Sequence, residues 1–193
     1  MGRVVVTELV SLDGVMEAPG GEPGHAHTGW VARVPDGGQF SYKLEEILEA
    51  EVHLLGRITY ESFAGAWPER TDEAGFADKM NAMPKHVVSS TLDSLEWNNS
   101  HVLEGDAIEE VRALKERIDG VILVAGSRTL AHALLARGLV DELRMMVFPV
   151  VLGSGARLLP DSPERMELEL VETRSWESGV VLVVYRPAAT GGG

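Results

Sequence analysis

The chain contains no cysteine among its 193 residues. Disulfide bonds, cysteine-ligated metal ions and a thiol nucleophile are therefore excluded. Long hydrophobic runs are missing too: the longest apolar stretches, such as 121–125 and 180–185, have the length of a strand rather than of a membrane span. Strand-like sequence starts at Arg3, so we expect no signal peptide and a cytoplasmic protein.

Basic residues are scarce, with 17 Lys and Arg against 30 Asp and Glu and a net charge of −13. A protein that binds nucleic acid or an anionic membrane needs a basic face, so we expect neither partner. An anionic ligand would need a local group of donors that overrides the negative field of the whole chain.

Apolar content of 45% indicates a globular protein, and we expect a single domain over residues 1–187 with a flexible Gly-rich tail over 188–193. Strand and helix patterns alternate in the first two thirds, which predicts a mostly parallel sheet with helices on both faces. The expected strands are 3–9, 51–55, 85–89, 101–103, 121–125, 142–151, 166–174 and 180–186, and the expected helices are 42–49, 59–63, 76–83, 107–117 and 128–136. The last three strands follow one another without helices and predict antiparallel additions at one edge. The loop 11–36 is too long for a simple connector, which suggests a functional role.

The stretch 53–63 is the first candidate for a binding site. A buried apolar strand runs into Gly56 and Arg57, and Thr59 follows at the start of a helix. Glycine allows close approach of a ligand, the helix N-terminus favours an anion, and the guanidinium group suits phosphate. An ordinary strand-to-helix connection with a surface arginine explains this segment alone about equally well.

The segment 53–63 thus forms a corner between a strand and a helix. A second corner repeats the same pattern after strand 121–125, where Gly126 and Ser127 precede Arg128, Thr129 and Leu130. Two corners of this kind suit a ligand with several phosphates, and a dinucleotide is the simplest candidate. Two well-capped helices are the alternative. Neither corner is a Walker A loop or a G-x-G-x-x-G fingerprint. A third polar segment, 89–91, follows strand 85–88 where α/β sheets bind ligands.

These segments, in this order, resemble the dihydrofolate reductase superfold, and more closely the reductase-domain family named for the C-terminal domain of the bifunctional riboflavin deaminase-reductase. Support comes from three further segments: Ser-Leu-Asp-Gly at 11–14, Gly-Trp at 29–30 and Phe-Pro-Val-Val-Leu-Gly-Ser-Gly at 148–155. The resemblance covers residues 3 to about 186. It implies a three-layer α/β/α fold with a mixed, mostly parallel sheet of about eight strands.

The resemblance also implies NADPH as the cofactor, and it assigns a role to each matching residue. Phosphates on the adenylate side would lie at Gly56, Arg57 and Thr59, and the adenosine ribose with its 2′-phosphate at Ser89 and Ser90. The pyrophosphate and the nicotinamide ribose would lie along Gly126, Ser127, Arg128, Thr129 and Leu130, and the nicotinamide near Leu9, Asp13 and Met16. Trp30, Pro149 and Gly153 would lie on the substrate side, and Asp13 and Trp30 are the candidate catalytic residues.

Several of these assignments have a second interpretation. Asp13 is either a proton relay beside the nicotinamide or the acceptor of an Asp-Gly turn. Trp30 either stacks on a substrate ring or packs as a lid residue, and Gly153 either contacts substrate or shapes a tight loop. His25 and His27 lie two residues apart without a third ligand at suitable spacing, so we expect no metal site.

The sequence therefore predicts an NADPH-dependent reductase of a small heterocyclic or carbonyl- or imine-bearing metabolite, similar to the 5-amino-6-(5-phosphoribosylamino)uracil reductase domain of riboflavin biosynthesis. Folate reductases carry an acid roughly where Phe40 or Ser41 stands, whereas Asp36 and Glu45 are out of register, so dihydrofolate is a poor substrate. The alternatives are a true dihydrofolate reductase with an acid from elsewhere, and a non-catalytic nucleotide- or ligand-binding module. The apolar C-terminal strands suggest a homodimer.

Overall fold

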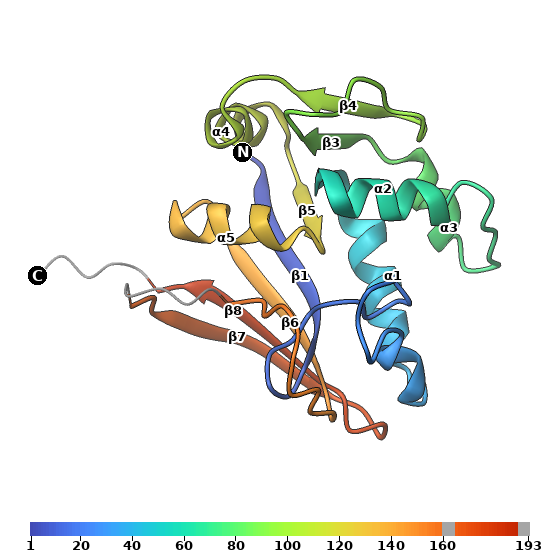
Figure 1. Ribbon diagram of the computed structural model, residues 1–193. Helices are drawn as coiled ribbons and strands as arrows, with labels where there is room; N and C mark the ends of the chain where they lie inside the picture. The colour runs from blue at the N-terminus through green and yellow to red at the C-terminus, as the bar shows by residue number, and fades with distance from the viewer. Residues whose placement is uncertain (160–164, 189–193) are drawn as a thin grey trace, which may run out of the picture.

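The computed structural model describes residues 1–159 and 165–188. One eight-stranded sheet with the order β4-β3-β2-β5-β1-β6-β8-β7 organises the chain (Figure 1). Its strands are β1 (Arg3–Ser11), β2 (Ala50–Gly56), β3 (Lys85–Val88), β4 (Ser100–Leu103), β5 (Val121–Ala125), β6 (Glu142–Phe148), β7 (Leu168–Ser175) and β8 (Val181–Pro187). β1 to β6 pair in parallel, and β8 pairs antiparallel with both β6 and β7. The predicted mixed sheet with antiparallel C-terminal strands is confirmed.

Helices cover both faces of this sheet, as the alternation of patterns predicted. They are α1 (Gln39–Glu49), α2 (Arg57–Ala66), α3 (Phe76–Ala82), α4 (Ala107–Arg117) and α5 (Arg128–Ala136), with a short 3₁₀ helix η1 (Trp30–Arg33) in the long loop. Strand side chains alternate between faces, so Val4 and Val6 pack with α4 and α5, whereas Val5 packs with α1, α2 and α3. Figure 1 shows α2 and α3 on the opposite side of β5 from α4 and α5.

Several element boundaries differ from the sequence expectation for identifiable reasons. α2 begins at Arg57 rather than Thr59, because Gly56 is already the residue before the first turn. α1 begins three residues earlier than expected, at Gln39. β6 ends at Phe148 instead of Val151, since Pro149 has no backbone N–H for the ladder. The predicted helices 107–117 and 128–136 match α4 and α5, and Asp106 caps α4 as expected.

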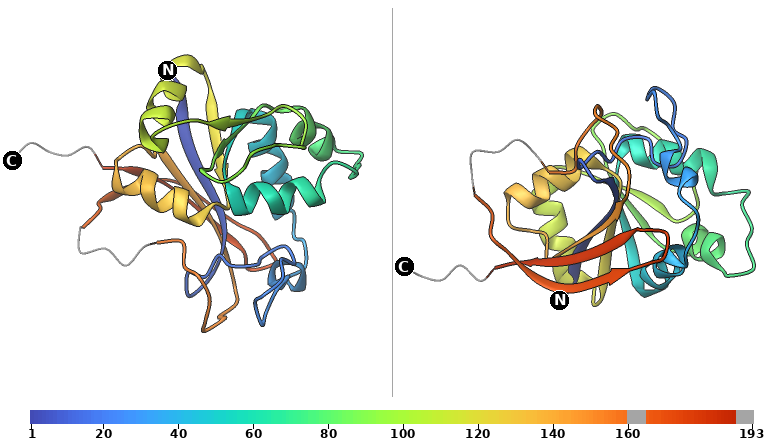
Figure 2. Two further views of the ribbon diagram at one scale, coloured as in Figure 1. Left: turned by 45° about the horizontal axis from the view of Figure 1, so that its top comes forward. Right: turned by 90° about the horizontal axis from the view of Figure 1, so that it is seen from below.

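All six parallel strands point the same way, so their carboxyl ends share one edge of the sheet. This edge carries the ends of β4, β3, β2, β5, β1 and β6 in that spatial order. Figure 2 shows the β7–β8 pair as an extension of the sheet beyond β6. No helix in the described part of the chain is both long and apolar enough to cross a membrane. Of the expected flexible tail 188–193, residues 189–193 lie outside the described residues.

Candidate functional site

The two predicted corners meet at the carboxyl edge of the sheet, because β2 and β5 are neighbours. The backbone amide of Gly56 donates to Ser127 Oγ at 2.9 Å. The amide of Ser127 in turn donates to Thr59 Oγ1 at 2.8 Å. Hydroxyl groups from each corner therefore fix the backbone of the other, and the two helix N-termini lie side by side.

Gly126 occupies the tightest position of this junction. Its φ is +67°, and a Cβ atom placed there would lie 2.9 Å from Thr59 Cγ2. Ser127 follows with φ +56°, a left-handed conformation that is unusual for a residue with a side chain. Ser127 thus adopts a glycine-like backbone while its hydroxyl group accepts from the amide of Gly56.

The first-turn amides of α2 and α5 lack the side-chain acceptors that the other α-helices have. Asp36 accepts from Gly38 and Phe40 at the start of α1. Asp72 and Asp106 serve the starts of α3 and α4 in the same way. In the described part of the chain no side chain accepts from the amides within the first turn of α2 or α5, because Ser127 Oγ and Thr59 Oγ1 accept only from Gly56 and Ser127, the residues that precede these two helices. Both helices thus keep unused N–H donors and their positive dipole ends at the junction, which is the arrangement that binds phosphate.

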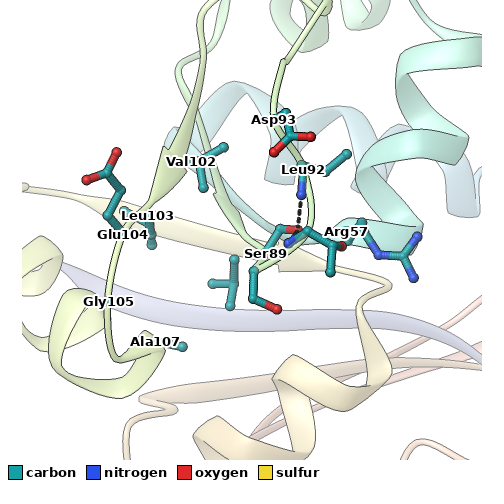
Figure 3. Close-up of a pocket in the computed structure, with 12 residues that line it drawn as sticks. Arg57, Ser89, Leu92, Asp93, Val102, Leu103, Glu104, Gly105 and Ala107 are labelled. Atoms are coloured by element: carbon teal, nitrogen blue, oxygen red, sulfur yellow. Dashed lines mark hydrogen bonds between the residues drawn. The ribbon is translucent and has the colours of Figure 1, made fainter.

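A cavity of about 820 Å³ opens beside this junction at the ends of β3 and β4 (Figure 3). Its lining residues are Arg57, Val88, Ser89, Ser90, Thr91, Leu92, Asp93, Val102, Leu103, Glu104, Gly105 and Ala107. Figure 3 shows Arg57 and Glu104 on opposite sides of it. The apolar members can cover an adenine ring, while the hydroxyl groups and the guanidinium group can hold a ribose and a phosphate.

Two of the cavity residues are already engaged within the protein. Arg57 Nη1 pairs with Glu61 Oε2 at 2.9 Å, one turn further along α2. Ser89 Oγ accepts from the amides of Thr91 and Leu92 at 3.2 and 3.1 Å. Ser89 therefore shapes the turn after β3, and Ser90 beside it lines the cavity. The cavity also contains two acids that the sequence analysis did not consider, Asp93 and Glu104.

The remaining residues of the second corner divide by exposure. The side chains of Arg128 and Thr129 are exposed at the start of α5. Leu130 is buried at 6% exposure and packs in the core between α5 and the sheet. Only the backbone of Leu130 is therefore available to a ligand at the helix start.

Leu9 and Met16 do not lie together, although both were predicted near the nicotinamide. Leu9 packs with Trp30 and Phe148 on the α1 side of the sheet. Met16 is buried on the α5 side, in the core that also contains Leu130 and Leu158. A ring at the end of β1 would therefore contact the two residues from different sides.

Asp13 connects the loop after β1 to the loop after β6. Its carboxylate accepts hydrogen bonds from Ser11 Oγ and from the amides of Leu152 and Gly153, at 2.7, 3.0 and 2.8 Å. Desolvation acts to raise the pKa of this carboxyl, but the hydrogen bonds outweigh it and lower the pKa to about 2. The carboxylate therefore links the two loops, whereas the Asp-Gly turn is closed by the Gly14 amide, which donates to the carbonyl of Ser11 at 2.9 Å. A proton relay through Asp13 stays a prediction.

A second cavity, of about 260 Å³, lies at the ends of β1 and β6 and includes Trp30 and Pro149 in its lining. Trp30 is only 1% exposed, its Nε1 donates to the carbonyl of Glu17, and its ring meets Phe148 edge to face. It forms a fixed wall here. Gly153 does not line this cavity: it has φ +78° and donates to Asp13, so it shapes the loop.

The sequence analysis missed Glu8, the one acidic residue within β1. Its side chain is 5% exposed, and its Oε1 has no hydrogen-bond partner among the described residues. Glu8 lies one residue beyond the last β1–β5 pair, Thr7 with Ala125, which places it beside Gly126. Burial raises the pKa of Glu8 well above its usual value, despite the opposing charge of Lys43 and a hydrogen bond from the Gly126 backbone. A charged residue within the apolar run 4–10 was the available signal.

Acids near the start of α1 are engaged elsewhere. Asp36 caps that helix, and Glu45 pairs with Arg174 at 3.3 Å. Glu46 is 2% exposed and lies 2.8 Å from Thr7 Oγ1 and from Lys43 Nζ. None of the three lines the second cavity.

The two loop histidines lie against each other rather than around a cation. The rings of His25 and His27 are 5.8 Å apart, and His25 Nε2 lies 3.1 Å from the carbonyl oxygen of Ser154. Among the residues that the structure describes, no group of three or more His, Asp or Glu side chains is placed to hold a metal ion.

The sheet order, the two helix layers and the ligand-side edge define a protein of dihydrofolate-reductase-like fold. The chain belongs to the RibD C-terminal domain family, whose model matches residues 3–182. It is 32% identical over 186 residues to the uncharacterized protein YyaP of Bacillus subtilis, covering 95% of this chain and 94% of YyaP. The resemblance seen in the sequence is confirmed.

Two solved structures show how far the fold extends. A putative riboflavin biosynthesis protein from Shewanella sp. PV-4 superposes with a TM-score of 0.75 at 17% identity, covering 97% of this chain and 99% of that one. The dihydrofolate reductase of Enterococcus faecalis complexed with NADP(H) gives a TM-score of 0.62 at 17% identity, covering 97% of each chain. Both likenesses concern the fold.

Proposed function

We propose that this protein is an NADPH-dependent reductase of a small heterocyclic or carbonyl- or imine-bearing metabolite. Its membership of the RibD C-terminal domain family and its fold support an oxidoreductase. The observation that carries the proposal is the pair of uncapped helices, α2 and α5, joined by the Gly56–Ser127 and Ser127–Thr59 hydrogen bonds. A dinucleotide pyrophosphate matches these unused donors.

The residues along the sheet edge fit the whole cofactor. The 820 Å³ cavity would take the adenosine half, with Arg57 and Ser90 beside the 2′-phosphate. Four inter-strand steps of about 4.8 Å separate β3 from β6, a span of about 19 Å, which suits an extended dinucleotide. When bound, NADPH supplies the hydride. The chain supplies orientation, a site from which water is excluded, and the wall formed by Trp30.

Reduction in riboflavin biosynthesis is one candidate role, because the family takes its name from that pathway's deaminase-reductase. Dihydrofolate remains a weaker candidate. Asp36, Glu45 and Glu46 are engaged with other groups and do not line the second cavity, so no acid from α1 is available to hold a pterin there. A non-catalytic binding module would share the cofactor site and differ only in the absence of turnover.

A homodimer through the C-terminal strands also belongs to this proposal. Register places Val147 beside Val181, and Tyr185 beside Leu170, on one face of β6, β8 and β7. Leu170 and Val181 are 56% and 37% exposed. A partly exposed apolar sheet face of this kind suits a second copy of the chain. Light scattering should give the mass of a dimer at micromolar concentration, and a monomer mass would contradict it.

Thermal unfolding with NADPH, NADP⁺, NADH and no ligand tests the cofactor assignment. At a hundredfold excess over its dissociation constant, a ligand stabilises the native state by about 2.7 kcal/mol, which corresponds to several degrees for a chain of this size. We expect a clear shift with NADPH and a smaller one with NADH. The absence of a shift with every nucleotide would exclude the reductase proposal.

A further inference from the structure

The lining of the second cavity has an unusual charge composition for this chain. Its residues are His27, Trp30, Arg33, Val34, Pro149, Val150, Val151 and Leu152. Two of them are basic and none is acidic, although acids outnumber Lys and Arg by 30 to 17 in the whole sequence. The 820 Å³ cavity differs, since Asp93 and Glu104 offset Arg57 there.

Arg33 is available to a ligand. It is exposed and forms no ion pair with any residue of 1–159 or 165–188, so its guanidinium group can bind an anion. Three acids of the surrounding loops are engaged: Asp13 accepts from the amides of Leu152 and Gly153, Glu17 Oε2 accepts from the amide of Ala156 at 2.7 Å, and Asp36 accepts from the amide of Gly38. No neighbouring carboxylate among these competes for Arg33.

The body of the cavity is lined by apolar side chains. Trp30 is held rigidly by its hydrogen bond to Glu17 and by Phe148. Val34, Val150 and Leu152 pack in the same cluster as Leu9, the residue expected beside the nicotinamide. Pro149 has no amide hydrogen, and the carbonyl of Val150 already accepts from Leu12 at 2.8 Å. The walls therefore favour an apolar group over a hydrogen-bonding one.

We propose that the cavity binds a compact anionic substrate, with its carboxylate or similar anion on Arg33 and His27 and its apolar part against Pro149, Val150 and Val151. This inference rests on the proposed function, because the cavity adjoins Leu9 at the end of β1. It assigns Arg33 as the residue that determines specificity for a charged substrate. Arg33 binds the anion as a bidentate hydrogen-bond donor, and His27 adds a further donor at the edge of the cavity.

Benzoate and benzamide form a matched pair of probes, since they share a ring and differ in charge. Their dissociation constants are to be measured by ligand-observed NMR with the wild type, Arg33→Gln, Arg33→Lys and Arg137→Gln. Arg137, at the end of α5, is an exposed arginine outside the cavity and serves as the control. We expect the wild type and the control to bind benzoate at least about tenfold more tightly than benzamide. Arg33→Gln should reduce the ratio to about one, and Arg33→Lys should keep part of it.

An equal affinity of the wild type for both probes, or a preference that survives in Arg33→Gln, would overturn the inference. Thermal unfolding with NADPH separates this outcome from a failure of the proposed function. Arg33→Gln should retain the NADPH shift, because Arg33 lies outside the dinucleotide junction. If benzoate is preferred while no nucleotide shifts the wild type, the anion site stands and the reductase assignment fails.

Discussion

The backbone amide of Ser127 donates to Thr59 Oγ1, and this bond joins two corners that lie 68 residues apart in the sequence. Ser127 closes the pair by accepting the amide of Gly56. Each corner would be an ordinary strand-to-helix connection by itself. Together they place two uncapped helix ends at one point of the sheet edge.

Replacing Thr59 with valine should destabilise the protein, because the Ser127 amide loses its acceptor. An unpaired, partly buried donor costs about 1–3 kcal/mol. Urea unfolding of Thr59→Val, with Thr59→Ser as the control that keeps the hydroxyl group, measures the difference. Equal stability of the two variants would show that the hydrogen bond contributes nothing.

Ser127 combines a left-handed backbone with a useful hydroxyl group, so two substitutions separate these effects. Ser127→Ala keeps the strained φ of +56° and loses the acceptor for Gly56. Ser127→Gly also loses the acceptor, but it regains about 1 kcal/mol because glycine adopts this backbone without strain. We expect the free energy of unfolding to fall in the order wild type, Ser127→Gly, Ser127→Ala. An alanine variant as stable as the wild type would contradict this account.

Much of the fold was predictable from the sequence, because helices 107–117 and 128–136 have strong periodicity and the first of them begins at a clear cap, Asp106. The two corners were predictable as local strand-glycine-helix patterns. Their contact was not, since it depends on β5 lying beside β2. The hydrogen bonds by which Asp13 joins the two loops could not be predicted either, because its partners Leu152 and Gly153 are 139 and 140 residues away.

Arg57 and Arg128 are predicted to contribute to NADPH affinity. Replacing either with alanine should weaken binding by about 1–3 kcal/mol, the usual range for a charge-assisted hydrogen bond. Arg57 lines the adenosine cavity, so Arg57→Ala should also narrow the preference for NADPH over NADH. Isothermal titration with both nucleotides measures this.

Glu61→Gln is the control for Arg57. It removes the ion pair with Arg57 and leaves the guanidinium group in place, so NADPH affinity should be kept or slightly raised. The exposed pair itself adds little to stability. Unchanged affinity in both arginine variants would contradict the assignment of the corners.

Glu8 should make the stability of the protein depend on pH. Its pKa in the folded state lies above its pKa in the unfolded state. At a pH between these two values, the native state carries a proton on Glu8 that the unfolded state has lost. The contribution of Glu8 to the free energy of unfolding is therefore at its full value below a pH of about 4.5. It declines as the pH rises toward the folded-state pKa, by up to about 1.4 kcal/mol per pH unit. Lys43 opposes this trend and Glu46 reinforces it.

Glu8→Gln removes this contribution while keeping the size of the side chain. Urea unfolding of both proteins at pH 5, 6, 7 and 8 should show the variant gaining stability relative to the wild type as the pH rises. A constant difference across that range would mean that Glu8 does not hold its proton in the folded state.

We expect Asp13 to link the loops after β1 and β6 through hydrogen bonds and not to donate a proton. Its pKa of about 2 keeps it ionised across neutral pH, and its two amide partners flank the second cavity. Asp13→Asn retains one acceptor oxygen and turns an NH₂ group toward the other amide, so one of these two bonds is lost. The loop 151–155 should then open more often, which limited proteolysis detects as faster cleavage there.

NADPH affinity should have the same pH dependence in variant and wild type between pH 6 and 8, since neither carries a titrating group at position 13 in that range. A pH dependence present in the wild type and missing from Asp13→Asn would instead show that Asp13 titrates in this range.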